Sequence, residues 1–216
     1  MLFAMRSWCS FYFQARRSRS RFIWSLVGLG SVILISQTQA GVFSLPHLVN
    51  PGQFAIGFEP GFVMTGGAAM DINLKYTHGI SESNNLTGIV GTGGGARQFR
   101  IGGSFSFDLF PDLVNQPGFG IAIQSLFVQL AGMTGSLETT AIPYVHKSFN
   151  TIYGVVEPFL AVPMGLVLFD GFYRNLSTVV VGSLFEYNEH IRSVFEFGVT
   201  LNHTQTYLSG GIVYYH

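Results

Sequence analysis

The stretch Phe99–Leu109 reads FRIGGSFSFDL and decides the fold class of this chain. Its aromatic and aliphatic residues fall at every second position, and the positions between them hold Arg100, Ser104, Ser106 and Asp108. Successive side chains of a β-strand point to opposite faces, whereas a helix repeats every 3.6 residues. The stretch therefore predicts a strand with one apolar face and one polar, charged face.

The same alternation recurs along the chain, most clearly in 54–62, 70–77 and 191–202. We count ten such segments, and short turn-rich connections separate them. The predicted segments are 52–64, 69–79, 85–93, 97–110, 118–131, 136–148, 152–168, 174–187, 190–202 and 205–216. Short connections favour an antiparallel meander in which each strand lies beside the previous one. Eight strands remain an alternative if 80–96 is largely loop.

Four prolines, at positions 60, 143, 158 and 163, fall inside predicted strands. Proline has no N–H to give to a strand ladder, so each one predicts a bulge or a strand end. The segment 152–168 holds two of them and is long enough to bend or split.

Residues 1–40 differ in composition from the rest of the chain. They hold five arginines and no acidic residue, and an apolar run from Phe22 to Ile35 precedes small residues at Thr38 and Ala40. A basic start, a short apolar run and a small-x-small ending predict a secretory signal peptide over 1–40. The predicted strands then form one domain over 41–216, which is interpreted below as a β-barrel. The apolar run is shorter than the roughly 20 residues that span a bilayer. An uncleaved anchor is the alternative.

Charge and composition exclude several classes of protein. Only 10% of residues are charged and 48% are hydrophobic, which excludes a disordered chain. The region 41–216 holds six basic and eleven acidic residues, a net charge of 6 − 11 = −5, so we expect no nucleic-acid binding. Its lack of cysteine excludes disulfides and multi-cysteine metal sites.

The choice of buried face separates a soluble barrel from a membrane barrel. A soluble barrel of this size would have to pack a large set of aromatic side chains inside, and 10% charge is low for a surface exposed to water. Outer-membrane barrels place apolar residues outside and polar residues inside. Lipid offers no hydrogen bonds, so such a barrel must close. We therefore predict a closed, all-β, antiparallel up-and-down transmembrane barrel.

This interpretation places the isolated strand charges in the lumen. The predicted lumenal charges are Glu59, Lys75, Arg100, Asp108, Glu157, Glu186, Arg192 and Glu196. Burying an isolated charge is costly, so we expect pairs between neighbouring strands, namely Lys75 with Glu59, and Glu196 with Arg192 or Arg100. The lumen would be filled by these pairs or would leave a narrow ion path.

Tyrosines gather near the predicted strand ends, as expected for aromatic girdles at the two bilayer interfaces. They are Tyr76, Tyr144, Tyr153, Tyr173, Tyr187, Tyr207, Tyr214 and Tyr215.

The signal peptide, the glycine- and aromatic-rich alternation and the ending Leu208, Ile212, Tyr214, His216 resemble the small outer-membrane β-barrels of Gram-negative bacteria. This resemblance implies a monomer in contact with outer-membrane lipid and lipopolysaccharide. It also implies that 205–216 is recognised by the barrel assembly machinery, although Tyr215 and His216 stand where that family usually ends in Phe. The implied role is structural, surface-associated or porin-like with a narrow pore.

Two other function classes remain open. One is a soluble periplasmic carrier of an apolar ligand, similar to lipocalins. The other is a lipid-modifying enzyme of the outer membrane, with candidate residues His146, His190, His203, Ser193, Ser209, Glu189 and Glu196. These residues form no recognised motif, and the glycine-rich 91–95 precedes a strand and not the helix that a dinucleotide loop needs. We expect no enzymatic activity, no cofactor and no metal.

Overall fold

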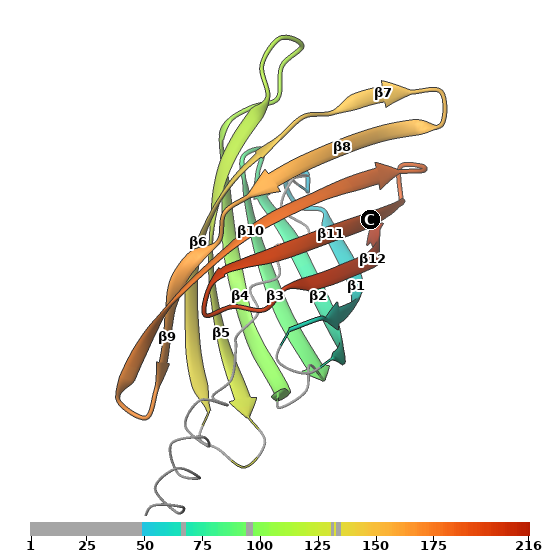
Figure 1. Cartoon of the computed structure of the whole chain (residues 1–216). Helices are drawn as coiled ribbons and strands as arrows, with labels where there is room; N and C mark the ends of the chain where they lie inside the picture. The colour runs from blue at the N-terminus through green and yellow to red at the C-terminus, as the bar shows by residue number, and fades with distance from the viewer. Residues whose placement is uncertain (1–48, 66–67, 94–96, 131, 133–134) are drawn as a thin grey trace, which may run out of the picture. The chain divides into compact units, whose positions relative to one another are not determined.

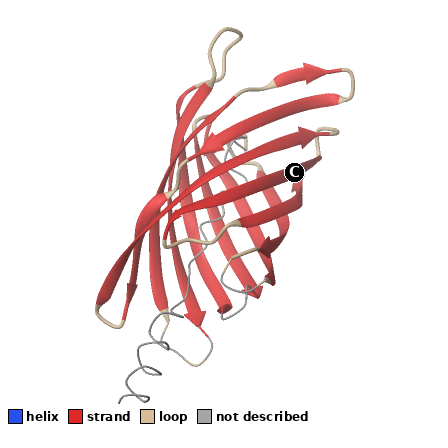
Figure 2. Ribbon diagram, viewed as in Figure 1, coloured by secondary structure: helices blue, strands red, loops and turns tan. Residues whose placement is uncertain are grey.

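The computed structural model describes residues 49–216 except 66–67, 94–96, 131 and 133–134, so the predicted signal peptide lies outside the described residues. The described chain is built from strands and loops (Figure 2). The strands are β1 (Phe54–Val63), β2 (Ala69–Ser81), β3 (Asn84–Gly93), β4 (Arg97–Phe110), β5 (Gly118–Leu130), β6 (Ser136–His146), β7 (Phe149–Thr151), β8 (Gly154–Ala161), β9 (Met164–Phe169), β10 (Phe172–Glu186), β11 (Ile191–Asn202) and β12 (Tyr207–Tyr215). No helix in this part is long and apolar enough to cross a bilayer.

The strands close into one antiparallel barrel (Figure 1). Each strand from β1 to β5 pairs with the next, β10 pairs with β11, and β12 pairs with both β11 and β1. β8 and β9 both lie between β6 and β10, so they are two halves of one barrel position. The barrel thus has ten positions, which confirms the prediction of ten strands over the alternative of eight.

The break between β8 and β9 falls at Val162 and Pro163, inside the segment that the sequence predicted to bend or split. Pro163 accepts a hydrogen bond from the Thr178 amide at 3.1 Å, and Pro143 accepts one from Val162 at 3.0 Å. Both prolines use their carbonyls, which are free to accept, and neither needs an N–H there. The strand is therefore interrupted without leaving the barrel wall, because β8 and β9 both run antiparallel to β10 in one register.

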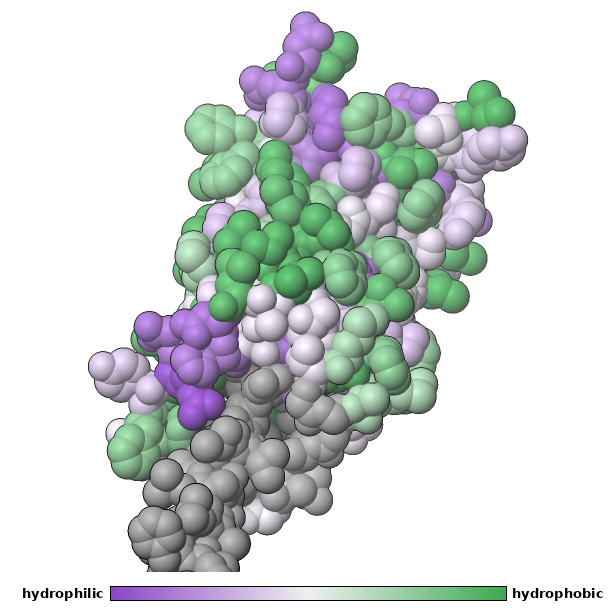
Figure 3. Space-filling view, viewed as in Figure 1, coloured by the Kyte–Doolittle hydropathy of each residue, from purple (hydrophilic) through white to green (hydrophobic). Residues whose placement is uncertain are grey.

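The predicted alternation of faces is confirmed. In β2 the odd positions from Asp71 to Thr77 are buried, and the even positions from Met70 to Tyr76 are exposed. In the decisive stretch, Phe99 lies 41% exposed and Arg100 only 5%, whereas Phe105 and Phe107 are half-buried and pack against each other with ring centres 4.5 Å apart. On the face drawn in Figure 3, hydrophobic residues cover much of the middle, between hydrophilic groups near the top and at the lower left.

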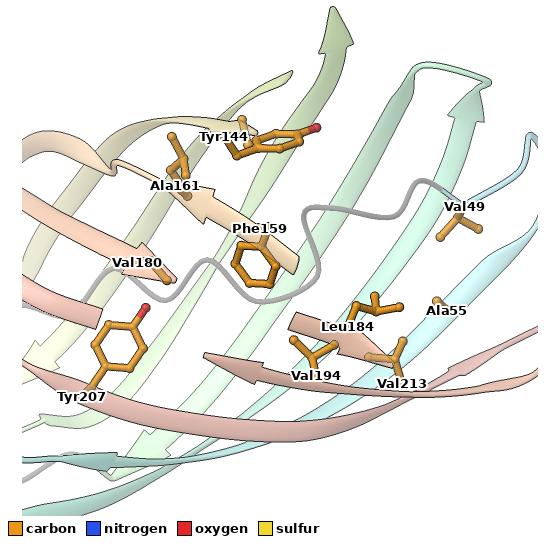
Figure 4. Packing of buried hydrophobic residues seen from close by; sticks show 12 residues of the cluster. Val49, Ala55, Tyr144, Phe159, Ala161, Val180, Leu184, Val194, Tyr207 and Val213 are labelled. Carbon is orange, nitrogen blue, oxygen red and sulfur yellow. The ribbon is translucent and has the colours of Figure 1, made fainter. Parts of the chain in front are cut away.

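Most of the apolar side chains that point inward gather on one side of the lumen, and a smaller cluster of Ile89, Leu126 and Val128 lies on β3 and β5. This apolar wall comes mainly from β5, β6, β8 and β10–β12 and includes Ile142, Tyr144, Phe159, Val180, Leu184, Val194, Tyr207 and Val213. Figure 4 shows several of them projecting from neighbouring strands into the same space.

The two ends of the barrel differ. β1 begins and β12 ends at one end, which we name the terminal end, together with the connections 82–83, 111–117, 147–153 and 187–190. At the opposite end, the far end, β1, β3, β5, β9 and β11 end and β2, β4, β6, β10 and β12 begin. At the terminal end β7 pairs only with β8, so this hairpin extends beyond the closed ring.

Candidate functional site

The centre of the lumen holds two ion pairs, which we name the central cluster: Glu59, Asp71, Lys75 and Arg100. Lys75 Nζ lies 2.8 Å from Glu59 Oε2, so the predicted pairing of these two residues is confirmed. Both side chains are almost completely buried. Ser209 of β12 donates a hydrogen bond of 2.9 Å to Glu59 Oε1, which links three consecutive strands through one carboxylate.

The second pair of the central cluster crosses a strand. Arg100 of β4 donates to Asp71 of β2 at 2.7 Å, although β3 lies between them. Gly91 of β3 faces Asn73 on one side and Arg100 on the other, and a Cβ at this position would collide with both side chains. Because position 91 is a glycine, the guanidinium of Arg100 has room to reach across β3 to Asp71.

A small enclosed space remains beside the central cluster. Glu59, Asn73, Lys75, Arg100 and Gln124 line it together with two aliphatic side chains, and its volume is about 20 Å³. A space of this size holds roughly one water molecule. The Nε of Arg100 has no hydrogen-bond partner among the described residues and gives such a water a donor.

A second group of charges lies toward the terminal end. His146, the last residue of β6, places Nδ1 2.5 Å from Glu157 Oε1 of β8, and its Nε2 lies 3.6 Å from Asp108 Oδ1 of β4. The alternation had marked Asp108 and Glu157 as lumenal, and the structure brings them together around this histidine. His146 was considered in the sequence only as a catalytic residue, because an isolated histidine carries no signal of its partners.

The remaining predicted charges also lie on the inner face, with different partners from those expected. Arg192 lies 3.2 Å from Glu186, and its guanidinium sits 4.1 Å from the centre of the Tyr215 ring. Glu196 is fully buried and accepts a hydrogen bond from Tyr207 at 3.4 Å. The two arginines proposed for Glu196 thus bind Glu186 and Asp71 instead.

Three of the predicted girdle tyrosines lie inside the barrel. Tyr144 and Tyr207 are 2% and 0% exposed and belong to the apolar wall, and Tyr215 packs under Arg192. The alternation along the strands could have predicted this, because Tyr207 lies on the same strand face as the inward Ser209 and Tyr144 on the same face as the inward Glu138. The other five, Tyr76, Tyr153, Tyr173, Tyr187 and Tyr214, are exposed as expected for a girdle.

An ion pair outside the strands fastens two connections at the terminal end. Lys147 Nζ donates to Asp112 Oδ1 at 2.6 Å and to the carbonyls of Leu113 and Gln116, and the Ser148 amide donates to Asp112 at 2.7 Å. Slight burial by itself raises the pKa of the Asp112 carboxyl, but the hydrogen bonds from Lys147 and Ser148 outweigh it and lower this pKa below its ordinary value. The loop 111–117 is thereby attached to the start of the β7–β8 hairpin.

The histidines considered for catalysis lie apart from the serines proposed with them. His190 contacts the Tyr215 carbonyl, and His203 occupies a turn with a positive φ of 49°. Among the described residues, no hydrogen bond joins either of them or His146 to Ser193 or Ser209. Ser193 instead donates to Tyr187, and Ser209 to Glu59. In this part of the chain, no group of three or more His, Cys, Asp or Glu residues is placed to hold a metal ion.

Comparison with known proteins gives no family for this chain, since no family model and no curated protein matches it. Among solved structures, a de novo designed transmembrane β-barrel is similar, with a TM-score of 0.40 and 13% identity over 79% of this chain and 100% of that one. The translocator domain of the autotransporter NalP from Neisseria meningitidis has a TM-score of 0.40 and 10% identity over 93% of this chain and 97% of that one. Similarities this distant carry no argument about function, so the function must be argued from the geometry.

Proposed function

We propose that this chain is an integral β-barrel protein of the bacterial outer membrane, with a structural or surface-associated role and at most a narrow pore. The observation that carries the proposal is the distribution of charge. Every charged side chain that the structure describes within a strand has the parity of the inner face. The other described charges lie in the connections at the two ends.

The outer face supports a lipid environment. Large apolar side chains on the strands, such as Leu74, Ile123 and Phe195, are about half exposed. Roughly 25 cal/mol is gained for each Å² of apolar surface removed from water, so such a face is unfavourable in water and favourable against acyl chains. Closure of the ring leaves the ten wall positions with a neighbour on each side, as the lack of hydrogen-bonding partners in lipid requires.

The inner face supports a filled or very narrow lumen over an open channel. The central cluster pairs its four charges with one another across β1, β2 and β4, and the enclosed space beside it admits about one water. The interior of a barrel of about this size is narrow enough for its own side chains to fill it. We expect little or no ion conductance.

Several parts of the proposal follow from the resemblance of the sequence and go together. We propose export by the N-terminal segment, assembly through recognition of 205–216, contact with outer-membrane lipid and lipopolysaccharide, and a monomeric state. A non-enzymatic role is part of the same proposal. The partners found for Ser193 and Ser209 support it, because both hydroxyls are engaged away from the candidate histidines.

The proposal is tested by membrane extraction of the full chain expressed in a Gram-negative host. We expect the protein to remain in the outer-membrane pellet after alkaline carbonate and to be released by detergent. Release by carbonate or by salt would instead indicate the soluble carrier. Planar bilayer recordings of the detergent-purified protein then test the lumen, and a conductance like that of a wide general porin would contradict the filled lumen.

A further inference from the structure

The outer surface has a groove at the seam where the last strand meets the first. The groove encloses about 520 Å³. Its sides are formed by Phe58, Phe62, Met70 and Phe195, and its floor includes Pro60 and Gly210. It belongs to the apolar outer face, so the inference below rests on the proposed membrane location.

The floor of this groove is a gap in the strand ladder. Phe54 and His216 exchange two backbone hydrogen bonds, at 3.2 and 2.9 Å, so hydrogen-bonded pairs between β1 and β12 recur at every second residue from there. Counting along the register, Pro60 stands opposite Gly210 at such a position, and it has no N–H to give to the Gly210 carbonyl. The paired register accordingly stops at Phe58 with Ile212 and resumes at Gly61 with Ser209.

The inner side of the wall is closed behind the gap. Ser209 donates to Glu59 at 2.9 Å, and Glu59 binds Lys75, so side chains tie β12 to β1 and β2 where the backbone does not. The groove is therefore a depression on the outer surface and not a passage into the lumen. Gly210 points outward into it without a side chain, between the rings of Phe58 and Phe195.

We propose that this seam groove binds one acyl chain of a zwitterionic phospholipid. An acyl chain matches a groove whose sides are aromatic and thioether groups and which is continuous with the apolar outer face. Among the residues that the structure describes, no charged side chain lines the groove, and the basic residues of the strands point into the lumen. Lipid A carries phosphates that attract lysine and arginine, so the charge distribution favours a lipid without net charge.

The test fills the groove without disturbing the wall. A Cβ at Gly210 would lie 3.6 Å from the Val194 carbonyl oxygen and 3.9 Å from the Phe195 ring, both ordinary contacts, so Gly210→Leu fits and occupies the groove. Gly210→Val is a second variant, because β-branched residues suit strands. Gly88→Leu is the matched control: Gly88 also points outward from a strand, on β3, and its Cβ would meet nothing closer than 4.0 Å.

The measurement is native mass spectrometry of the full-length protein in detergent micelles that contain dipalmitoyl phosphatidylethanolamine. We expect one retained lipid on the wild type and on Gly88→Leu. On both Gly210 variants we expect retention about tenfold weaker, equivalent to losing the burial of about two methylene groups. A heat-modifiability gel confirms that each variant is folded.

Three results would overturn the assignment. If all folded variants retain the lipid equally, the lipid binds elsewhere. If the wild type forms a dimer that only the Gly210 variants lose, a second copy of the chain occupies the groove. Preferential retention of added lipid A would replace the phospholipid. A failure of the proposed membrane location would be seen separately, as extraction of the wild-type protein by carbonate. The three results above concern a protein that stays in the membrane.

Discussion

The lumen of this barrel has two unlike walls. One side, from β1, β2 and β4, carries the central cluster and its polar neighbours. The apolar wall, mainly from β5, β6, β8 and β10–β12, packs aliphatic and aromatic side chains, with the buried charges of His146, Glu157, Arg192 and Glu196 among them. Both walls have the same alternation and the same exposed apolar outer face, so the composition of an inner face is not dictated by the membrane. It is dictated by how that part of the lumen is filled, mainly by ion pairs on one side and by apolar packing together with ion pairs on the other.

The largest expected effect comes from breaking one ion pair of the charged wall. Lys75→Met leaves the buried Glu59 carboxylate without its cation, although Ser209 still donates to it. Removing one partner of a buried pair typically costs several kcal/mol, and we expect a loss of about 4 kcal/mol in the free energy of unfolding. Urea unfolding in detergent micelles, followed by far-UV circular dichroism, measures it.

The double variant Glu59→Leu/Lys75→Met is the matched control. Replacing both members of a buried pair by apolar residues is often neutral, so we expect it to recover most of the stability that the single variant loses. If the double variant is as unstable as the single one, the charged wall depends on polarity itself and not on charge pairing.

Truncation of the apolar wall is the next largest effect. Leu184 is 1% exposed and packs within the inner cluster. Leu184→Ala removes buried methyl groups and leaves a cavity, so we expect a loss of about 3 kcal/mol. Leu74→Ala, on the outer face and 54% exposed, is the control. An equal loss in the control would mean that the two faces are not distinguished by packing.

The difference between the walls also explains what the sequence could predict. Strand faces followed from parity and strand limits from the turn-rich connections, as 97–110 shows, because β4 spans the same residues. The Lys75–Glu59 pair followed because β1 and β2 are consecutive strands joined by a short connection. The Arg100–Asp71 pair did not, because it needs a glycine at position 91 of the strand between them. The apolar wall was not predicted, because only polar and charged residues marked the inner face in the sequence, and apolar residues of inward parity such as Val180 and Val194 carry no such mark.

A hydroxyl placed in each wall sharpens the comparison further. Val180 is fully buried in the apolar wall, and Val180→Thr keeps the shape while adding a polar group without a designed partner. We expect a loss of about 1 to 2 kcal/mol. On the side of the central cluster, Thr77 of β2 and Thr87 of β3 share a hydrogen bond of 3.0 Å, so a hydroxyl is accommodated there. A Val180→Thr variant as stable as the wild type would mean that water reaches the apolar wall.

An ion pair in water gives the smallest effect and completes the series. Asp112 and Lys147 lie in connections at the terminal end and are partly exposed, so Asp112→Asn should cost only about 0.5 kcal/mol. Hydrogen exchange of the 111–117 amides, compared between variant and wild type, detects the loosened attachment. Because the hydrogen bonds lower the pKa of Asp112, its contribution is complete above the ordinary aspartate pKa of about 4 and disappears as the pH falls through the lowered value. The two proteins should therefore differ at pH 7 and converge in strong acid. A difference that persists there would contradict a role for the carboxylate charge of Asp112, because both proteins then carry a neutral side chain at position 112 and share the carbonyl contacts of Lys147.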